Sequence, residues 1–356
     1  MASTFLFLKY FKQVTNLLNK IFKFMKEACF LISSERSGSN FITKIIDAHK
    51  EFCGPSPTHI IRTFALNCLR YGNLSNDKNW NELLKDVEFL INHQVGIWST
   101  KQDFNSLKKN VKKREIVELI NFIYDQERIY HKKNRLFIKE NRAHLFSPFL
   151  VANYPDAKFI FLCRDPRDMC LSWKNNPAHE GGVTNAANIW KEDQENNLFL
   201  SGFLKDTKKI LIVRYEDLTQ NLEVECKRIS KFLDVTYDPN MLKFYQNDMT
   251  KLNSEKFKAW SNLSKKVIKN NSGKFKEQLD KTEIEYIEGI CYNAMNTLGY
   301  KPIYAKKQID NVSLKNELIN NKKYSPEKKL PEEEALVRKR RLDKIHDILN
   351  KQLALY

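Results

Sequence analysis

The chain has 356 residues, 42% of them hydrophobic, and its 60 Lys and Arg outnumber 43 Asp and Glu to give a formal net charge of +17. This length and composition are enough for one large α/β domain or two smaller ones, and they exclude a disordered protein. The basic surplus predicts an anionic partner such as a nucleotide, a nucleic acid, a membrane surface or an acidic glycan.

The seven cysteines show no pattern that suits a metal. The sequence has no CxxC pair and no Cys/His cluster with metal-ligand spacing, so we predict no metal site. Most of the cysteines stand in apolar runs, which indicates buried, reduced thiols and a cytoplasmic protein. They are Cys29, Cys53, Cys68, Cys163, Cys170, Cys226 and Cys291.

The N-terminal segment predicts a basic amphipathic helix over residues 1–26. Apolar residues recur at helical spacing from Phe11 to Met25, and lysines interrupt the segment throughout. No uncharged stretch approaches the ~20 residues that a bilayer span needs. We expect this helix to pack on the protein's own core, and the alternative is peripheral contact with a membrane.

Short apolar runs separated by helical patterns predict a parallel sheet covered by helices on both faces. Ligands of such sheets bind beyond the carboxyl ends of the strands, so the informative loops are those that follow each strand. The predicted strands are 28–33, 136–138, 158–162 and 210–213, and helical patterns cover 144–153, 184–204 and 221–234.

Two other regions are described by their composition. Residues from about 60 to 132 are charged and predict a helical insertion that would shape a substrate pocket of a domain that spans 27–304. From residue 305 to 356, runs of Lys and Arg mix with acidic residues. This pattern predicts a charged, partly helical extension whose charges face solvent.

Small and basic residues follow the first predicted strand. Residues 33–41 read Ser-Ser-Glu-Arg-Ser-Gly-Ser-Asn-Phe and precede a predicted helix. Small residues let successive backbone N–H groups curl round an anion, and the helix N-terminus adds partial positive charge. Arg36 supplies bidentate donors, and the hydroxyls of Ser37 and Ser39 add more. An ordinary helix cap made by either serine would explain the small residues too.

A second motif follows the third predicted strand. Residues 164–168 read Arg-Asp-Pro-Arg-Asp, and Ser172 lies eight residues after Arg164. Pro166 suits the first turn of a helix, where its missing N–H has no partner. Arg164 would lie at the strand end and Ser172 on the helix, so the pair can converge on a second phosphate. The alternative is that the acidic residues of the motif simply pair with Arg167.

Together, these motifs resemble the sulfotransferases that use 3′-phosphoadenosine 5′-phosphosulfate (PAPS). The resemblance covers roughly residues 28–302 and includes local similarity to protein-tyrosine sulfotransferases. The further segments that fit it are 213–218, 226–233, 260–263, 272–274 and 298–300. The resemblance implies an α/β, P-loop-NTPase-like, three-layer fold with a central parallel sheet. It also implies PAPS as co-substrate, with no metal.

The resemblance also implies a role for each residue at the donor. The loop from Arg36 to Phe41 would hold the 5′-phosphosulfate, and Arg164 with Ser172 would hold the 3′-phosphate. Tyr215 would lie near the adenine, and Lys274 would approach from a C-terminal loop. Many members of the family have Lys in place of Arg36. The full set is Arg36, Ser37, Gly38, Ser39, Asn40, Phe41, Arg164, Ser172, Tyr215 and Lys274.

The reaction needs a general base, because the acceptor hydroxyl must lose a proton as it attacks sulfur. Residues 53–62 resemble the segment that carries the base in protein-tyrosine sulfotransferases, although no carboxylate stands where that subfamily has Glu. His59 is the nearest titratable group and becomes the candidate base, with a structural hydrogen-bonding role as the alternative.

The loop after the second predicted strand offers rival catalytic residues. Lys139 would bind the sulfuryl oxygens, and Glu140 and His144 are further candidate bases. Structural alternatives are that Glu140 pairs with Arg142 or caps a helix, and that His144 starts that helix.

The sequence thus predicts a PAPS-dependent sulfotransferase whose acceptor is a hydroxyl, with a carbohydrate favoured over a tyrosine peptide or small metabolite, and no nucleic-acid partner. A P-loop kinase is one alternative, but GxxxxGK[ST] is absent. A basic nucleic-acid-binding protein is another, but the basic residues are spread along the chain. Trp98, Trp173 and Trp190 are candidate stacking surfaces for an acceptor, or else ordinary core residues.

Overall fold

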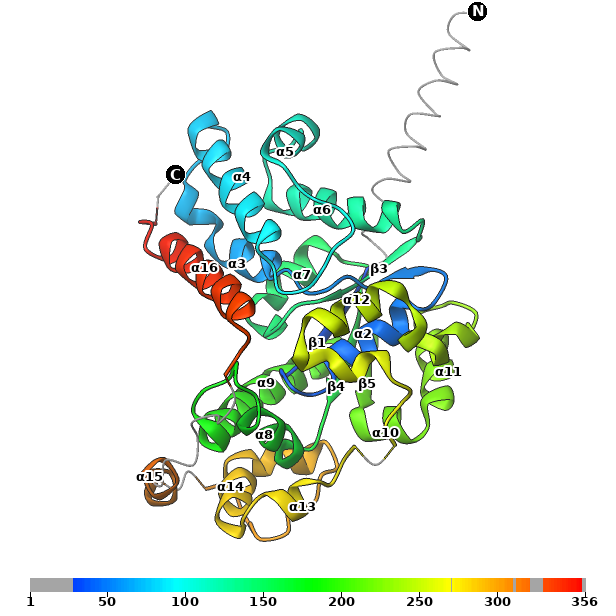
Figure 1. The fold of residues 1–356 in the computed structure, drawn as a ribbon, viewed down its shortest axis with the longest axis vertical. Helices are drawn as coiled ribbons and strands as arrows, with labels where there is room; N and C mark the ends of the chain where they lie inside the picture. Colours follow the sequence, from blue (N-terminus) through cyan, green and yellow to red (C-terminus); the bar gives the residue numbers. More distant parts are fainter. Residues whose placement is uncertain (1–27, 270, 310–311, 321–328, 354–356) are drawn as a thin grey trace, which may run out of the picture.

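The computed structural model describes residues 28–269, 271–309, 312–320 and 329–353. The predicted N-terminal helix over 1–26, with its possible membrane contact, lies outside the described residues. Within the described ranges, parallel strands form a five-stranded sheet in the order β2-β3-β1-β4-β5 (Figure 1). The strands are β1 (Cys29–Ser33), β2 (Phe52–Cys53), β3 (Arg135–Lys139), β4 (Lys158–Cys163) and β5 (Ile210–Arg214).

The four predicted strands are confirmed, and β2 was missed. This strand has only two residues, and its pairing with β3 joins Phe52 to Arg135 and Cys53 to Leu136. Two residues carry no periodicity that a sequence pattern can reveal. The strand exists because the edge of β3 offers it backbone partners.

Helices cover both faces of the sheet, as predicted. Alternate residues of β1 point to opposite sides: Phe30 and Ile32 belong to one apolar core, and Cys29 and Leu31 to the other. The first core includes residues of α8 (Pro166–Lys174), α9 (Gly182–Leu204) and α14 (Lys281–Thr297), and the second includes residues of α2 (Ser39–Asp47), α10 (Tyr215–Gln220) and α11 (Leu222–Phe232).

The predicted helical region from about 60 to 132 is confirmed. It forms a group of helices beside the β3 end of the sheet (Figure 1). These are α3 (Ile60–Asn67), η1 (Cys68–Tyr71), α4 (Asp77–Asn92), α5 (Phe104–Asn110) and α6 (Ile116–Tyr130). The remaining elements are η2 (Ala143–Phe146), α7 (Ser147–Asn153), η3 (Lys205–Thr207), η4 (Pro239–Gln246), α12 (Asp248–Lys256), η5 (Lys258–Ser264), α13 (Phe275–Gln278), α15 (Val312–Asn320) and α16 (Glu332–Leu349).

The expectation that the charges of the C-terminal extension face solvent holds for most charged residues of α16, but it is wrong for two of them. Glu334 and Arg341 are less than a tenth exposed, and Ile348 is fully buried. The helix packs against α3 and α4, as Figure 1 shows for the red helix. Arg341 is held because its guanidinium donates to the carbonyl oxygens of Thr58 and Leu90. Of the helices in the described ranges, none is long and apolar enough to cross a membrane.

Candidate active site

The loop between β1 and α2 requires glycine at its last position. Gly38 precedes α2 with φ of +89°, in the left-handed region that side chains disfavour. A Cβ atom there would lie 2.4 Å from Cδ2 of Tyr215, the first residue of α10. The helix has no side-chain cap, so the alternative in which Ser37 or Ser39 simply caps it is wrong.

The predicted donor residues lie around one cavity of about 520 Å³ at the carboxyl ends of the strands. The exception is Ser37, which is fully buried behind the loop. The structure therefore brings together segments that are separated by more than two hundred residues in the chain. Those that line the cavity are Arg36, Gly38, Ser39, Asn40, Phe41, Arg164, Ser172, Tyr215 and Lys274.

The two basic motifs touch one another. Arg36 donates from Nε to the Ser172 hydroxyl at 3.2 Å, and Arg164 donates from Nη1 to the Arg36 carbonyl oxygen at 2.8 Å. The Arg164 guanidinium also stacks over the Tyr215 ring, 4.4 Å from its centroid. Burial, together with Arg164, lowers the pKa of Arg36. Two cations that repel one another in the lining of one cavity favour a bound anion.

Arg164 has a buried donor without a protein partner. Its Nε makes no hydrogen bond to the described residues, and Arg164 lines the cavity. An unmet buried donor costs about 1–3 kcal/mol, which a phosphate or sulfate oxygen would offset. The Ser37 hydroxyl has no partner among the described residues either, but its side chain is fully buried and does not line the cavity. The donor set therefore suits a polyanionic ligand.

The rest of the second motif holds the site together. Arg167 pairs with Asp165 at 2.7 Å and with Glu288 of α14 at 2.7 Å, so the structural pairing weighed for this motif is present beside the Arg164 contacts. Asp168 accepts from the backbone N–H groups of Gly273 and Phe275, at 2.5 and 3.1 Å. This contact fixes the loop that carries Lys274 to the cavity.

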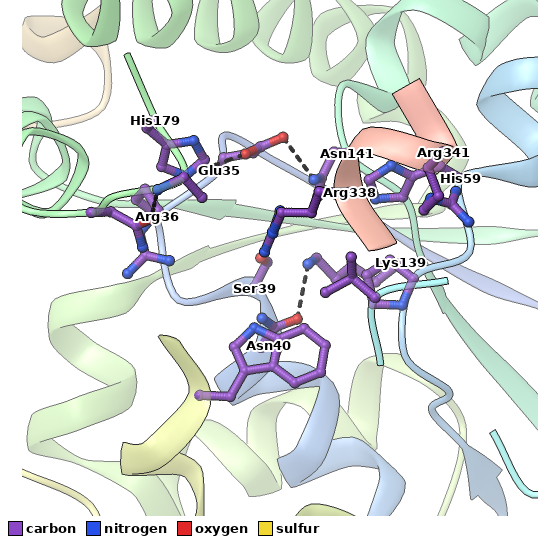
Figure 2. Close-up of a pocket in the computed structure, with 15 residues that line it drawn as sticks. Glu35, Arg36, Ser39, Asn40, His59, Lys139, Asn141, His179, Arg338 and Arg341 are labelled. Carbon is purple, nitrogen blue, oxygen red and sulfur yellow. Dashed lines mark hydrogen bonds and ion pairs between the residues drawn. The ribbon is translucent and has the colours of Figure 1, made fainter. Parts of the chain in front are cut away.

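A second, smaller cavity of about 120 Å³ adjoins the first at Arg36, Ser39 and Asn40 (Figure 2). Lys139, at the end of β3, lines it and donates to Oδ1 of Asn40 at 2.9 Å. Burial lowers the pKa of Lys139 to about 8, partly offset by Glu35 and Glu140. Lys139 is therefore a cation that titrates close to neutral pH.

His59 lines the same small cavity as Arg36 and Asn40 of the loop after β1. It precedes α3 with φ of +62°, a strained backbone conformation for a non-glycine residue. Burial and the nearby Arg341 hold its pKa well below the ordinary value, so its imidazole is neutral at physiological pH. A neutral imidazole is the form that accepts a proton.

Glu140 and His144 do not line either cavity described here. Glu140 is buried and accepts hydrogen bonds from the hydroxyls of Thr58 and Tyr124, not from Arg142. Burial raises its pKa to about 7. His144 lies 3.3 Å from the Asp193 carboxylate. Both side chains therefore have structural partners away from the cavities, whereas His59 lines one of them.

The profile of the sulfotransferase family matches residues 29–239. The chain belongs to the sulfotransferase family. The match includes the loop from Arg36 to Phe41 and the motif that begins at Arg164. It ends before Lys274 and α16.

The curated relatives match parts of this chain. The chain is 24% identical to carbohydrate sulfotransferase 1 of Danio rerio over 119 residues, which are 33% of this chain and 27% of that protein. It is 29% identical over 130 residues to a Caenorhabditis briggsae protein that is named as a protein-tyrosine sulfotransferase, covering 35% of this chain and 46% of that one. The matches thus span less than half of either relative.

Solved structures share the fold of this chain. The sulfotransferase domain of the Synechococcus PCC 7002 olefin synthase matches 77% of this chain and 94% of that domain, with a TM-score of 0.55 and 18% identity. The sulfotransferase domain of the curacin biosynthetic pathway matches 78% of this chain and 98% of that domain, with a TM-score of 0.52 and 18% identity. These likenesses confirm the predicted fold.

The three tryptophans singled out from the sequence are not stacking surfaces. Trp190 is fully buried, Trp98 and Trp173 are less than a tenth exposed, and each indole N–H donates to a backbone carbonyl oxygen. The tryptophan that lines both cavities of the sulfotransferase is Trp260. Arg338 of α16 was also missed. No motif marks it, because its place depends on how α16 packs.

Across the residues the structure covers, no cluster of three or more His, Cys, Asp or Glu could hold a metal ion.

Proposed function

We propose that this sulfotransferase transfers the sulfuryl group of PAPS to an acceptor hydroxyl, with a carbohydrate hydroxyl favoured. The observation that carries the proposal is the pairing of Arg36 with Ser172 across one cavity, next to Arg164. Two arginines from different loops, Arg36 and Arg164, line this cavity and suit a nucleotide with phosphate groups at both the 5′ and 3′ positions. ATP and AMP have no 3′-phosphate for the second site.

In the proposed complex, the loop from Arg36 to Phe41 holds the 5′-phosphosulfate, and Arg164 and Ser172 hold the 3′-phosphate. Tyr215 and Lys274 line the part of the cavity proposed for the nucleoside. The acceptor enters the smaller cavity, which meets the larger one at the phosphate loop. The sulfuryl group then lies where the two cavities join.

The proposed chemistry is an in-line displacement at sulfur. The acceptor oxygen forms a bond to sulfur, and the bond from sulfur to the 5′-phosphate oxygen breaks, which releases adenosine 3′,5′-bisphosphate. His59 takes the acceptor proton. Arg36 and Lys139 stabilise negative charge on the sulfuryl oxygens and the leaving phosphate, an effect that commonly contributes ~3–4 kcal/mol per donor.

We expect adenosine 3′,5′-bisphosphate to stabilise the protein against heat, and 5′-AMP and ATP to do so far less. A ligand at one hundred times its Kd adds about 2.7 kcal/mol to the free energy of unfolding, so the melting temperature should rise by a few degrees. The measurement is a thermal shift with each nucleotide at equal concentration. Arg164→Ala should remove the preference for the bisphosphate over 5′-AMP.

The matched control for this experiment is Arg114→Ala. Arg114 is partly exposed on the connection between α5 and α6, and it forms a surface ion pair with Asp77. This variant should keep the full preference for the bisphosphate. Equal stabilisation by ATP and the bisphosphate would favour a kinase-type nucleotide site, and stabilisation by neither would favour a protein that does not use these nucleotides.

The pH dependence of kcat/KM should report both proposed catalytic groups in the free enzyme. Lys139 has a depressed pKa of about 8, so it is protonated below that pH and activity should fall as pH rises above it. His59 is neutral until well below pH 6.5, so the acidic limb should lie lower than an ordinary histidine would place it. The measurement is a pH profile of initial rates.

Two variants assign the limbs of this profile. Lys139→Arg should move the basic limb to higher pH, because arginine stays protonated. His59→Gln should lower kcat/KM by at least tenfold across the range, since general-base catalysis typically contributes 10²–10⁴-fold. A basic limb that stays in place in Lys139→Arg, or a His59→Gln enzyme with near-normal activity, would contradict the corresponding role.

A further inference from the structure

The C-terminal helix α16 contributes charged side chains to both cavities. Glu334 lines the large cavity, and Arg338 and Arg341 line the small one. In Figure 2, Arg338 extends from α16 into the middle of the group formed by Ser39, Lys139 and Asn141. This helix lies beyond the region that matches the family, so the family's motifs do not account for these residues.

Buried contacts hold α16 in place. Arg341 donates from Nη2 to the Thr58 carbonyl oxygen at 2.7 Å, directly before His59. Lys344 pairs with Asp86 of α4 at 3.1 Å, and the Ile348 side chain is fully buried. Arg338 lies one turn before Arg341 on the same face of the helix. These contacts aim Arg338 at the cavity next to His59.

The lining of the small cavity is strongly cationic. Its charged groups are the cations of Arg36, Lys139, Arg338 and Arg341 and the single carboxylate of Glu35. That carboxylate is already engaged, because it accepts from Asn141 at 2.7 Å and lies 3.6 Å from His179. Like charges gathered in a partly buried site repel one another, and a bound anion relieves that repulsion.

The donor accounts for only part of this charge. In the proposed reaction, Arg36 and Lys139 meet the sulfuryl group. The guanidinium of Arg341 donates its hydrogen bonds to the backbone carbonyl oxygens of Leu90 and Thr58. Arg338 is the cation that is left to bind another group. It donates from Nε and Nη2 to Glu334 at 2.9 and 2.6 Å, and its Nη1 group makes no hydrogen bond to the described residues. Its side chain is about one-third exposed, so a ligand can reach it.

We propose that Arg338 recognises an acceptor that carries an anionic group, such as a carboxylate, sulfate or phosphate, next to its reacting hydroxyl. The proposal rests on the proposed function, because it assigns the small cavity to the acceptor. At about 120 Å³ this cavity is smaller than a typical ligand pocket, so it holds only the reacting end of a larger molecule. Arg338 is thus a specificity residue, and its fork geometry suits carboxylate and sulfate oxygens.

The test uses two pairs of probes that differ by one anionic group: methyl β-D-glucuronide with methyl β-D-glucoside, and 4-hydroxyphenylacetate with 4-hydroxyphenylacetamide. Dissociation constants are measured by ligand-observed NMR on the full chain saturated with adenosine 3′,5′-bisphosphate. In at least one pair, the anionic member should bind at least tenfold more tightly. Arg338→Gln should reduce that preference to below threefold, and Arg338→Lys should retain most of it.

The control is Arg340→Gln, which removes the same charge from an exposed position two residues along α16 and should keep the full preference. A lack of charge preference in both pairs, or an equal preference in Arg338→Gln, would overturn the proposal. Tighter binding of neutral and anionic probes to Arg338→Gln would also overturn it, because Arg338 would then obstruct the cavity. Failure to bind the bisphosphate would instead count against the proposed function, and the charge preference is then measured without nucleotide.

Discussion

Arg36→Ala should lower kcat/KM for sulfuryl transfer by about 10²–10³-fold, the usual cost of removing one preorganised donor from a developing negative charge. The side chain lies where the two cavities meet and is positioned by its bond to Ser172. Arg36→Lys should lose less than tenfold, because it keeps the charge. The measurement is the initial rate of adenosine 3′,5′-bisphosphate formation from PAPS with an acceptor.

The fold of this variant should not suffer. Burial and the neighbouring Arg164 already disfavour the charge of Arg36, as its lowered pKa indicates. Removal of a cation from such a site relieves repulsion, so the thermal midpoint of Arg36→Ala should equal or exceed that of the unmodified protein. Full activity in Arg36→Ala would show that the phosphate loop does not bind the sulfuryl donor, and the proposed function would fail at its centre.

Arg167→Ala should lower the free energy of unfolding by about 3–5 kcal/mol, the cost of breaking a buried ion pair by removing one partner. Arg167 is almost fully buried and bridges Asp165 to Glu288, which is completely buried. Its guanidinium also stacks over the Phe275 ring, 4.2 Å from the centroid. Without it, two carboxylates would remain in the interior without their cation.

The loss is measured by urea unfolding, with Lys227→Ala as the control. Lys227 pairs with Glu223 on the surface of α11, and the two side chains are 57% and 54% exposed, so its removal should cost less than about 1 kcal/mol. Similar midpoints for Arg167→Ala and Lys227→Ala would show that the buried pairs contribute no more than a surface pair. Arg167→Met, which restores apolar volume, should recover little of the loss, because the carboxylates stay unpaired.

The donor side was predictable because its chemistry is local. An apolar strand followed by a loop rich in small residues and a helix specifies an anion site within a dozen residues. The carboxyl ends of parallel strands share one edge of the sheet, so the loops that contain Arg36 and Arg164 had to face the same cavity. The need for glycine at position 38 could not be predicted in this way. The Tyr215 ring that excludes a Cβ atom there follows β5, at the far edge of the sheet.

The proposed acceptor side depended on helix packing, which no short motif records. Glu140 was a candidate base from its place after β3, yet the fold turns it toward Thr58 and Tyr124 and leaves His59 in the cavity. Trp98 looked available for stacking until packing buried its ring.

The sequence by itself thus determined four of the five strands and the two loops that contain Arg36 and Arg164, because each depends on neighbours in the chain and on the geometry of a parallel sheet. The tertiary structure alone decided that α16 reaches the active site. A run of Lys, Arg and Glu is typical of a solvated helix. Only the burial of Arg341 and Ile348 against α3 and α4 sets the rotation of α16, and with it the direction in which Arg338 points.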